Sequence, residues 1–89
     1  MSGWIKAIER LPDGNGQLYA GCLESSPTVL VYGRDYEGKE AYGIAEYVRD
    51  HYNPRDSGWC GYMHDGWELE QCSVTHWMPM PEPPIEDKV

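Results

Sequence analysis

The stretch TVLVYG, residues 28–33, decides the fold class because it is the clearest strand signal in the sequence. Its residues are mainly β-branched or aromatic, and Pro27 and Gly33 bound it with residue types that are common in turns. A nearly continuous apolar run is typical of a strand in the centre of a sheet. We therefore predict a central strand at this position.

A second strand is predicted directly after the first. The segment RDYEGKE contains a turn signal at Gly38, and AYGIAEYV, residues 41–48, then alternates in side-chain character. One face would carry Tyr42, Ile44, Glu46 and Val48, and the other Ala41, Gly43, Ala45 and Tyr47. The two segments are expected to pair as a hairpin. A helix over residues 40–51 is the competing interpretation, because Ala, Glu and Arg favour helices.

Further elements flank this hairpin. The Asp65-Gly66 pair is a strong hairpin-turn signal, and WELEQ after it alternates like a strand. SVTHWMPM, residues 73–80, is the last strand candidate, since the prolines that follow cannot donate to a ladder. Toward the N-terminus we expect a short helical or irregular element near residues 5–10 and a short strand at residues 19–22.

These segments together predict a mainly β fold, with an α+β arrangement as the alternative. We expect a small antiparallel sheet or open barrel of four to five strands, with one or two short helices. Because 89 residues allow a single hydrophobic core, residues 1–82 would form one small domain. Residues 83–89 would form a proline-rich acidic tail.

The charge balance favours some partners over others. Seven Lys and Arg residues stand against fifteen Asp and Glu residues, which gives a formal net charge of -8. Direct binding to nucleic acid or to an anionic membrane needs clustered positive charge, so neither is expected. An acidic chain suits a basic surface on another protein. The N-terminal stretch lacks the features of a signal peptide, and three cysteines suit a reducing cytosol.

Two Cys–His pairs with equal spacing are the candidate metal ligands. Cys60 and His64 are followed by Cys72 and His76, and thiolate and imidazole are the ligands that zinc prefers. In an extended strand, however, Cys72 and His76 would lie roughly 13 Å apart, which is too far for one ion. Free thiols and unrelated histidines are the alternative interpretation, and no cofactor is expected beyond this candidate zinc.

Aromatic residues are the candidate binding residues. Trp59, Tyr62 and Trp67 could stack on a planar ligand or contact a partner, and Tyr36 and Tyr47 could join them. The same residues could equally form the core of a β domain that has no Phe. No motif for nucleophilic, acid–base or phosphate-loop chemistry is present, so no catalytic residue is predicted.

Motifs at both ends and in the middle of the chain resemble one family. Trp4-Ile5, Arg10-Leu11-Pro12, Val29-Leu30-Val31 and the run from His76 to Pro84 are similar to the domain of unknown function numbered five hundred and fifty-one, which occurs mostly in phages and prophages. The resemblance implies a small accessory protein of a phage or prophage, and it implies no activity. The final strand would point Trp77 and Met78 to opposite faces, with Trp4 packed near Trp77.

The functional expectation follows from these observations. We expect a non-enzymatic phage or prophage accessory protein, a counter-defence or host-takeover inhibitor that docks an acidic, Tyr- and Trp-rich surface on a host protein. It would act as a monomer or homodimer in the cytoplasm of the host bacterium. The alternatives are a binder of a small nucleotide-like ligand in an aromatic pocket and a zinc-stapled interaction module.

Overall fold

The computed structural model describes residues 3–84. In chain order, the elements are β1 (Ile5–Lys6), β2 (Leu23–Ser25), β3 (Val29–Arg34), β4 (Glu40–Asp50), the 3-10 helix η1 (Pro54–Asp56), β5 (Gly58–Met63), the 3-10 helix η2 (Leu69–Gln71) and β6 (Ser73–Pro79). The mainly β prediction is confirmed. Six strands are found in the described part of the chain, where four to five were expected.

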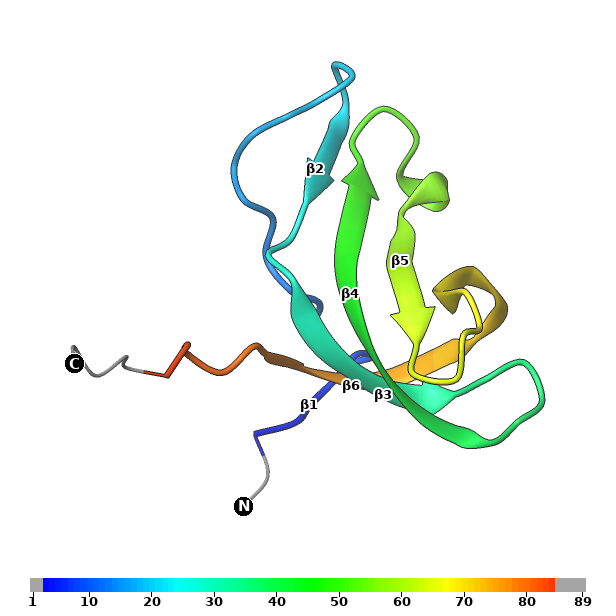
Figure 1. Ribbon diagram of the computed structural model, residues 1–89. Helices are drawn as coiled ribbons and strands as arrows, with labels where there is room; N and C mark the ends of the chain where they lie inside the picture. The colour runs from blue at the N-terminus through cyan, green and yellow to red at the C-terminus, as the bar shows by residue number, and fades with distance from the viewer. Residues whose placement is uncertain (1–2, 85–89) are drawn as a thin grey trace.

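All six strands belong to one open antiparallel sheet (Figure 1). The order is β1-β6-β3-β4, so β3 lies between β6 and β4, as its apolar run predicts. The long strand β4 pairs with β3 near its start, and Val48 near its end lies between Ser25 of β2 and Gly58 of β5. Strand β2 therefore continues the β3 side of β4, and β5 occupies the other side.

Alternation along the strands places the core on one face of the sheet. The buried apolar residues are Val29, Val31, Ala41, Ala45, Met63, Leu69 and Trp77. The helix alternative for residues 40–51 is wrong, because the small residues of β4 face this core at every second position. Trp77 is 4% exposed, and its ring N–H donates a hydrogen bond to the Arg10 carbonyl at 2.8 Å.

Three local predictions differ from the structure. Residues 5–10 contain the β1 strand and a turn closed by the Arg10 N–H on the Lys6 carbonyl, because β1 pairs with β6. The strand expected at residues 19–22 lies instead at β2, after a turn with positive φ at Ala20 and Gly21. WELEQ is not a strand, since Leu69–Gln71 forms η2 and only Glu68 bridges to Tyr62.

Trp4 also lies elsewhere than expected. Its ring is 6.2 Å from the Tyr32 ring and 6.3 Å from the Tyr42 ring, centroid to centroid. These tyrosines project from the face of the sheet opposite to the core, whereas Trp77 faces the core. The N- and C-terminal segments do meet, but through the pairing of Ile5 with Trp77 and not through a contact between the two tryptophans.

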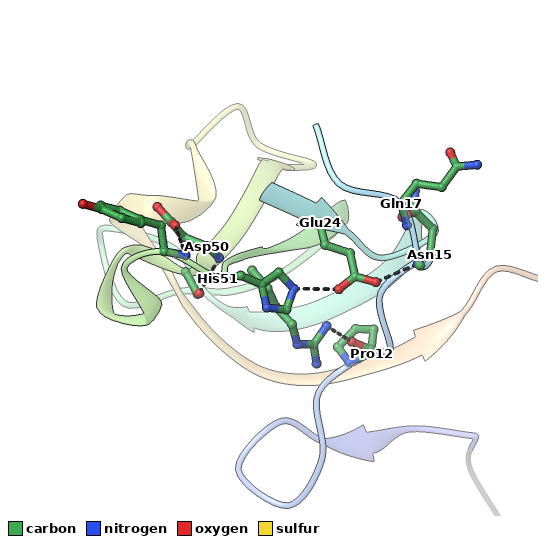
Figure 2. Close-up of polar contacts among 10 residues, drawn as sticks. Pro12, Asn15, Gln17, Glu24, Asp50 and His51 are labelled. Atoms are coloured by element: carbon green, nitrogen blue, oxygen red, sulfur yellow. Dashed lines mark hydrogen bonds and ion pairs between the residues drawn. The ribbon is translucent and has the colours of Figure 1, made fainter. Parts of the chain in front are cut away.

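Polar contacts hold the long N-terminal connection against the sheet. Arg49 donates a hydrogen bond to the Pro12 carbonyl at 2.6 Å, and the Glu24 carboxylate accepts one from the Gly16 N–H. Figure 2 shows Glu24 between the His51 imidazole and the loop that carries Asn15 and Gln17. These contacts with His51 and Gly16 hold the pKa of Glu24 below its usual value.

The described chain ends in an irregular segment after β6. Residues 80–84 contain no helix or strand, so the predicted boundary at 82/83 falls within an irregular segment, and residues 85–89 of the predicted tail lie outside the described residues. None of the described helices has the length and apolar character required to cross a membrane.

Candidate functional site

The face of the sheet that is opposite to the core is covered with aromatic and aliphatic side chains. Tyr42, Ile44 and Tyr62 on it are 57%, 53% and 60% exposed, which is high for large apolar residues. We call this surface the aromatic face, defined by Trp4, Leu30, Tyr32, Tyr42, Ile44, Tyr62, His64, His76 and Met78. Most of these residues belong to β3, β4, β5 and β6, so a rigid scaffold holds the surface.

Strand register arranges these side chains in two rows across the sheet. In the first row, Tyr32 lies opposite both His76 and Tyr42, and the Tyr42 carbonyl accepts a hydrogen bond from the N–H of His64. The second row runs from β6 to β5 as Met78, Leu30, Ile44 and Tyr62. A histidine thus stands at each end of a tyrosine pair, beside an apolar row.

The rings of the first row are in contact with one another. The Tyr32 and Tyr42 ring centroids are 5.1 Å apart, and His76 lies 6.1 Å from Tyr32. His64 lies 6.4 Å from Tyr42. These are tilted arrangements within the range that aromatic pairs favour. Burial and the neighbouring Glu40 carboxylate raise the pKa of Tyr32 above its usual value.

Two hollows open on the aromatic face and share Tyr42. One, of about 330 Å³, is lined by Trp4, Lys6, Tyr32, Tyr42 and His76. The other, of about 440 Å³, is lined by Leu30, Tyr42, Gly43, Ile44, Gly61, Tyr62 and His64. The first combines rings with the Lys6 ammonium, and the second is mainly apolar. Together they form a surface that can receive side chains of a partner.

The five aromatic residues predicted as binding residues are distributed over three places. Tyr62 is on the aromatic face. Tyr47 and Trp59 form an edge-to-face pair, with centroids 5.1 Å apart, that is half-buried at the margin of the core. Tyr36 and Trp67 contact each other at 5.0 Å beside the turn between β3 and β4. Trp59, Tyr62 and Trp67 therefore do not form one pocket.

The candidate metal ligands have separate partners. The ring Nδ1 of His64 lies 3.1 Å from the Tyr42 backbone, and that of His76 lies 2.8 Å from the Thr75 hydroxyl. The Cys72 thiol donates to the Glu68 carbonyl, and Cys60 is exposed on β5. Across residues 3–84, the structure holds no group of three or more Cys, His, Asp or Glu side chains placed to bind one ion.

The most unusual titratable pair lies at the turns beside the aromatic face. Asp35 is 5% exposed and accepts hydrogen bonds from the N–H groups of Glu37 and Lys39. It also shares a hydrogen bond with Asp65, which lowers the pKa of Asp35 and raises the pKa of Asp65. The backbone donors explain which carboxyl ionises first. This pair joins the β3–β4 turn to the turn after β5.

The matching family model covers residues 3–85 and is described as "Protein of unknown function (DUF551)". The chain belongs to this family. The motifs on which the resemblance rests lie at the start of β1, after the turn that follows it, in β3, and in β6 and the irregular segment after β6, and these segments pair or contact one another around Trp77. Neither a curated protein nor a solved structure matches the chain.

The sequence prediction missed the larger part of the aromatic face. Trp4, Tyr32, Tyr42 and Ile44 carry the surface, yet only the alternation of residues 41–48 indicated that Tyr42 and Ile44 share a face. That signal could have identified these two residues. Trp4 and His76 join them only through the strand order β1-β6-β3-β4, which no local pattern reveals.

Proposed function

We propose that this protein is a non-enzymatic binding protein that docks its aromatic face on another protein. The observation that supports the proposal is the pair of adjacent rows of exposed and half-buried apolar and aromatic side chains, on strands that the core already stabilises from the other face. Contiguous exposed apolar surface is typical of interaction sites, and tyrosine and tryptophan are common among residues that dominate binding energy.

The charge of the chain indicates the kind of partner. Glu46 follows Ile44 on the same face of β4, and Glu40 precedes Tyr42. Arg34 lies 4.0 Å from Glu40, so this positive charge is compensated locally. With a formal net charge of -8 for the whole chain, long-range attraction favours a partner with a basic rim around an apolar patch.

The biological setting of the proposal rests on the resemblance. The family similarity suggests a phage or prophage accessory protein in the bacterial cytoplasm, and a host protein is then the expected target. Inhibition of a host or defence protein is the form of action that we favour, because a rigid surface without its own chemistry acts by occupying a site. Either a monomer or a homodimer could present this surface.

The test is a comparison of two matched double variants. Y42T/I44T removes the centre of the aromatic face and places Thr, a β-branched residue that suits a strand, at both positions. I8T/Y52T makes the same two changes at residues that are 94% and 89% exposed and lie outside the face. Each variant would be used with the wild type as bait in a bacterial lysate, with quantitative mass spectrometry of the retained proteins.

We expect one retained protein to depend on Tyr42 and Ile44. Its affinity, measured by calorimetry with purified protein, should fall by roughly thirtyfold in Y42T/I44T, as for residues at the centre of an interface. I8T/Y52T should bind like the wild type. If every retained protein binds Y42T/I44T and the wild type equally, although both are folded by circular dichroism, the proposal is wrong.

A second function is favoured by the hollow around Trp4. Two tyrosines, a tryptophan, His76 and the Lys6 ammonium surround about 330 Å³, which would suit a planar ligand with a negative group. These rings differ from those of Trp59, Tyr62 and Trp67, which the sequence predicts for a nucleotide-like ligand. A panel of nucleotides should then change the fluorescence of the wild type but not of W4F, and a panel without effect would exclude these ligands.

A further inference from the structure

Strand β5 has an outer edge that the rest of the described chain covers only in part. On one side it pairs with β4 from Gly58 to Met63. On the other side, Met63 donates its N–H to the Trp67 carbonyl at 2.9 Å, and Tyr62 forms a single bridge with Glu68. Within residues 3–84, no strand pairs with this side of β5 before that bridge.

The hydrogen-bond pattern shows which backbone groups this edge presents. The N–H of His64 donates to the Tyr42 carbonyl on β4, whereas that of Met63 points away from β4. In an antiparallel ladder, alternate residues direct their backbone groups to the same side, and the β4–β5 register is continuous. The N–H and carbonyl of Trp59 therefore point outward, at a position where a further strand could pair.

A hollow of about 230 Å³ lies beside these groups, between β5 and η2. Trp59, Glu68 and Glu70 are among the residues that line it, and both glutamates are exposed. Neither carboxylate is in an ion pair with any described residue. An aromatic ring beside two unneutralised carboxylates is suited to a Lys or Arg side chain, through cation–π and charge-assisted contacts.

We propose that an extended, basic segment of the partner protein adds as a strand to the outer edge of β5. Its backbone would pair with Trp59, and one of its Lys or Arg side chains would enter the hollow between Trp59 and Glu68–Glu70. Strand addition of this kind takes its affinity from main-chain hydrogen bonds and its specificity from pockets for alternate side chains. The inference rests on the proposed function and adds a second contact region to the aromatic face.

A second copy of this chain is the competing occupant of the edge. Two chains that each carry a formal charge of -8 repel each other, and an added β5 strand, GWCGYM, contains no Lys or Arg to pair with Glu68 and Glu70. A basic segment would be attracted to these carboxylates. Sedimentation of the protein alone therefore belongs to the test, and a dimer that E68Q/E70Q strengthens would assign the edge to self-association and overturn the inference.

The probe is a random-peptide display library that is selected on the intact protein. We expect the enriched peptides to carry Lys or Arg at alternate positions among β-branched residues. Their affinity should fall by about threefold to thirtyfold on E68Q/E70Q, as for two exposed ion pairs. The control E9Q/E37Q removes the same charge from exposed residues elsewhere and should leave the affinity unchanged.

Backbone pairing is tested separately from charge. Methylation of alternate amides of an enriched peptide should abolish binding in one set of positions and leave it intact in the other, because only every second N–H of an added strand faces β5. Enriched peptides that tolerate methylation in both sets, or that bind E68Q/E70Q as well as wild type, would overturn the inference. A selection that enriches no basic peptides would also overturn the inference.

These outcomes can be separated from failure of the proposed function. Peptides that lose affinity on Y42T/I44T but not on E68Q/E70Q would support the aromatic face and reject the β5 edge. A lysate protein that depends on Tyr42 and Ile44 would do the same when E68Q/E70Q leaves its affinity unchanged and its binding does not slow amide exchange at Trp59.

Discussion

At the residue scale, the Asp35–Asp65 pair gives the protein a defined response to acid. The lowered pKa of Asp35 contributes stability above the usual aspartate pKa, and that contribution is lost as the pH falls. The raised pKa of Asp65 works in the opposite direction, since its contribution is complete at low pH and is lost as the pH rises through the folded value. As the pH rises, the pair therefore loses the proton that it shares and becomes two carboxylates that face each other.

D65N should stabilise the protein at neutral pH and lose this advantage in acid. The amide can donate to the Asp35 carboxylate without a charge, whereas the wild-type Asp65 must hold a proton to do so. Urea unfolding followed by circular dichroism at a series of pH values would measure the difference in midpoint. E9Q removes one exposed carboxylate elsewhere and controls for overall charge, and an equal gain at every pH would contradict the prediction.

Single residues also show what local sequence patterns can predict and what they cannot. Alternation predicted that Trp77 and Met78 point to opposite faces, and this is confirmed. The choice of Trp77 for the core depends on its register opposite Val31 of β3, which is a long-range fact. The predicted packing of Trp4 near Trp77 is wrong for the same reason, because the environment of Trp4 comes from strands that are distant in sequence.

At the element scale, the pairing of β3 with β6 contains one irregularity. Tyr32 lies opposite His76 but Gly33 lies opposite Val74, so Thr75 is an extra residue in β6. Gly33 permits this close approach, since a Cβ there would come within 1.8 Å of the Ser73 carbonyl oxygen. The neighbour is backbone and cannot rotate away.

G33A should therefore destabilise the domain, whereas G58A should be almost neutral. A Cβ on Gly58 in β5 would have no neighbour within 4 Å, so the same chemical change carries no overlap there. We expect G33A to lower the free energy of unfolding by about 1–3 kcal/mol or more, as for an overpacked site. Chemical denaturation of both variants would measure this, and equal midpoints would show that the bulge adapts.

Elements were predictable where the local signal was unambiguous. TVLVYG and AYGIAEYV became β3 and β4 with bounds close to those expected, because turn residues and alternation agree there. The strand prediction for WELEQ is wrong because two apolar residues separated by one position fit a strand and a tight 3-10 turn equally well. Leu69 is buried in either case, so burial alone did not distinguish them.

At the scale of the whole molecule, repulsion among the acidic residues opposes the compact fold. The sheet has one core face and one exposed face, and residues 3–84 give it a single layer of strands. The chain carries more than twice as many acidic as basic residues, fifteen against seven, around this thin core. Mutual repulsion of these charges should reduce the stability of the compact state.

Moderate salt should therefore raise the melting temperature at neutral pH. Sodium chloride at about 0.2 M shortens the range of electrostatic interactions to under 10 Å and screens the repulsion. The effect should disappear near pH 4.6, the isoelectric point, where the net charge is close to zero. Differential scanning calorimetry at both pH values measures it, and a salt effect of the same size at pH 4.6 would point to ion binding.

The order β1-β6-β3 has a consequence for the synthesis of this protein. During translation β3 and β4 can form their hairpin early, but β1 has no partner until β6 has left the ribosome. The nascent chain then exposes one free side of β3 and the Val31 face to solvent. Ribosome-bound chains that stop before Ser73 should consequently be sensitive to proteases and should recruit chaperones, and chains that extend beyond Pro79 should not.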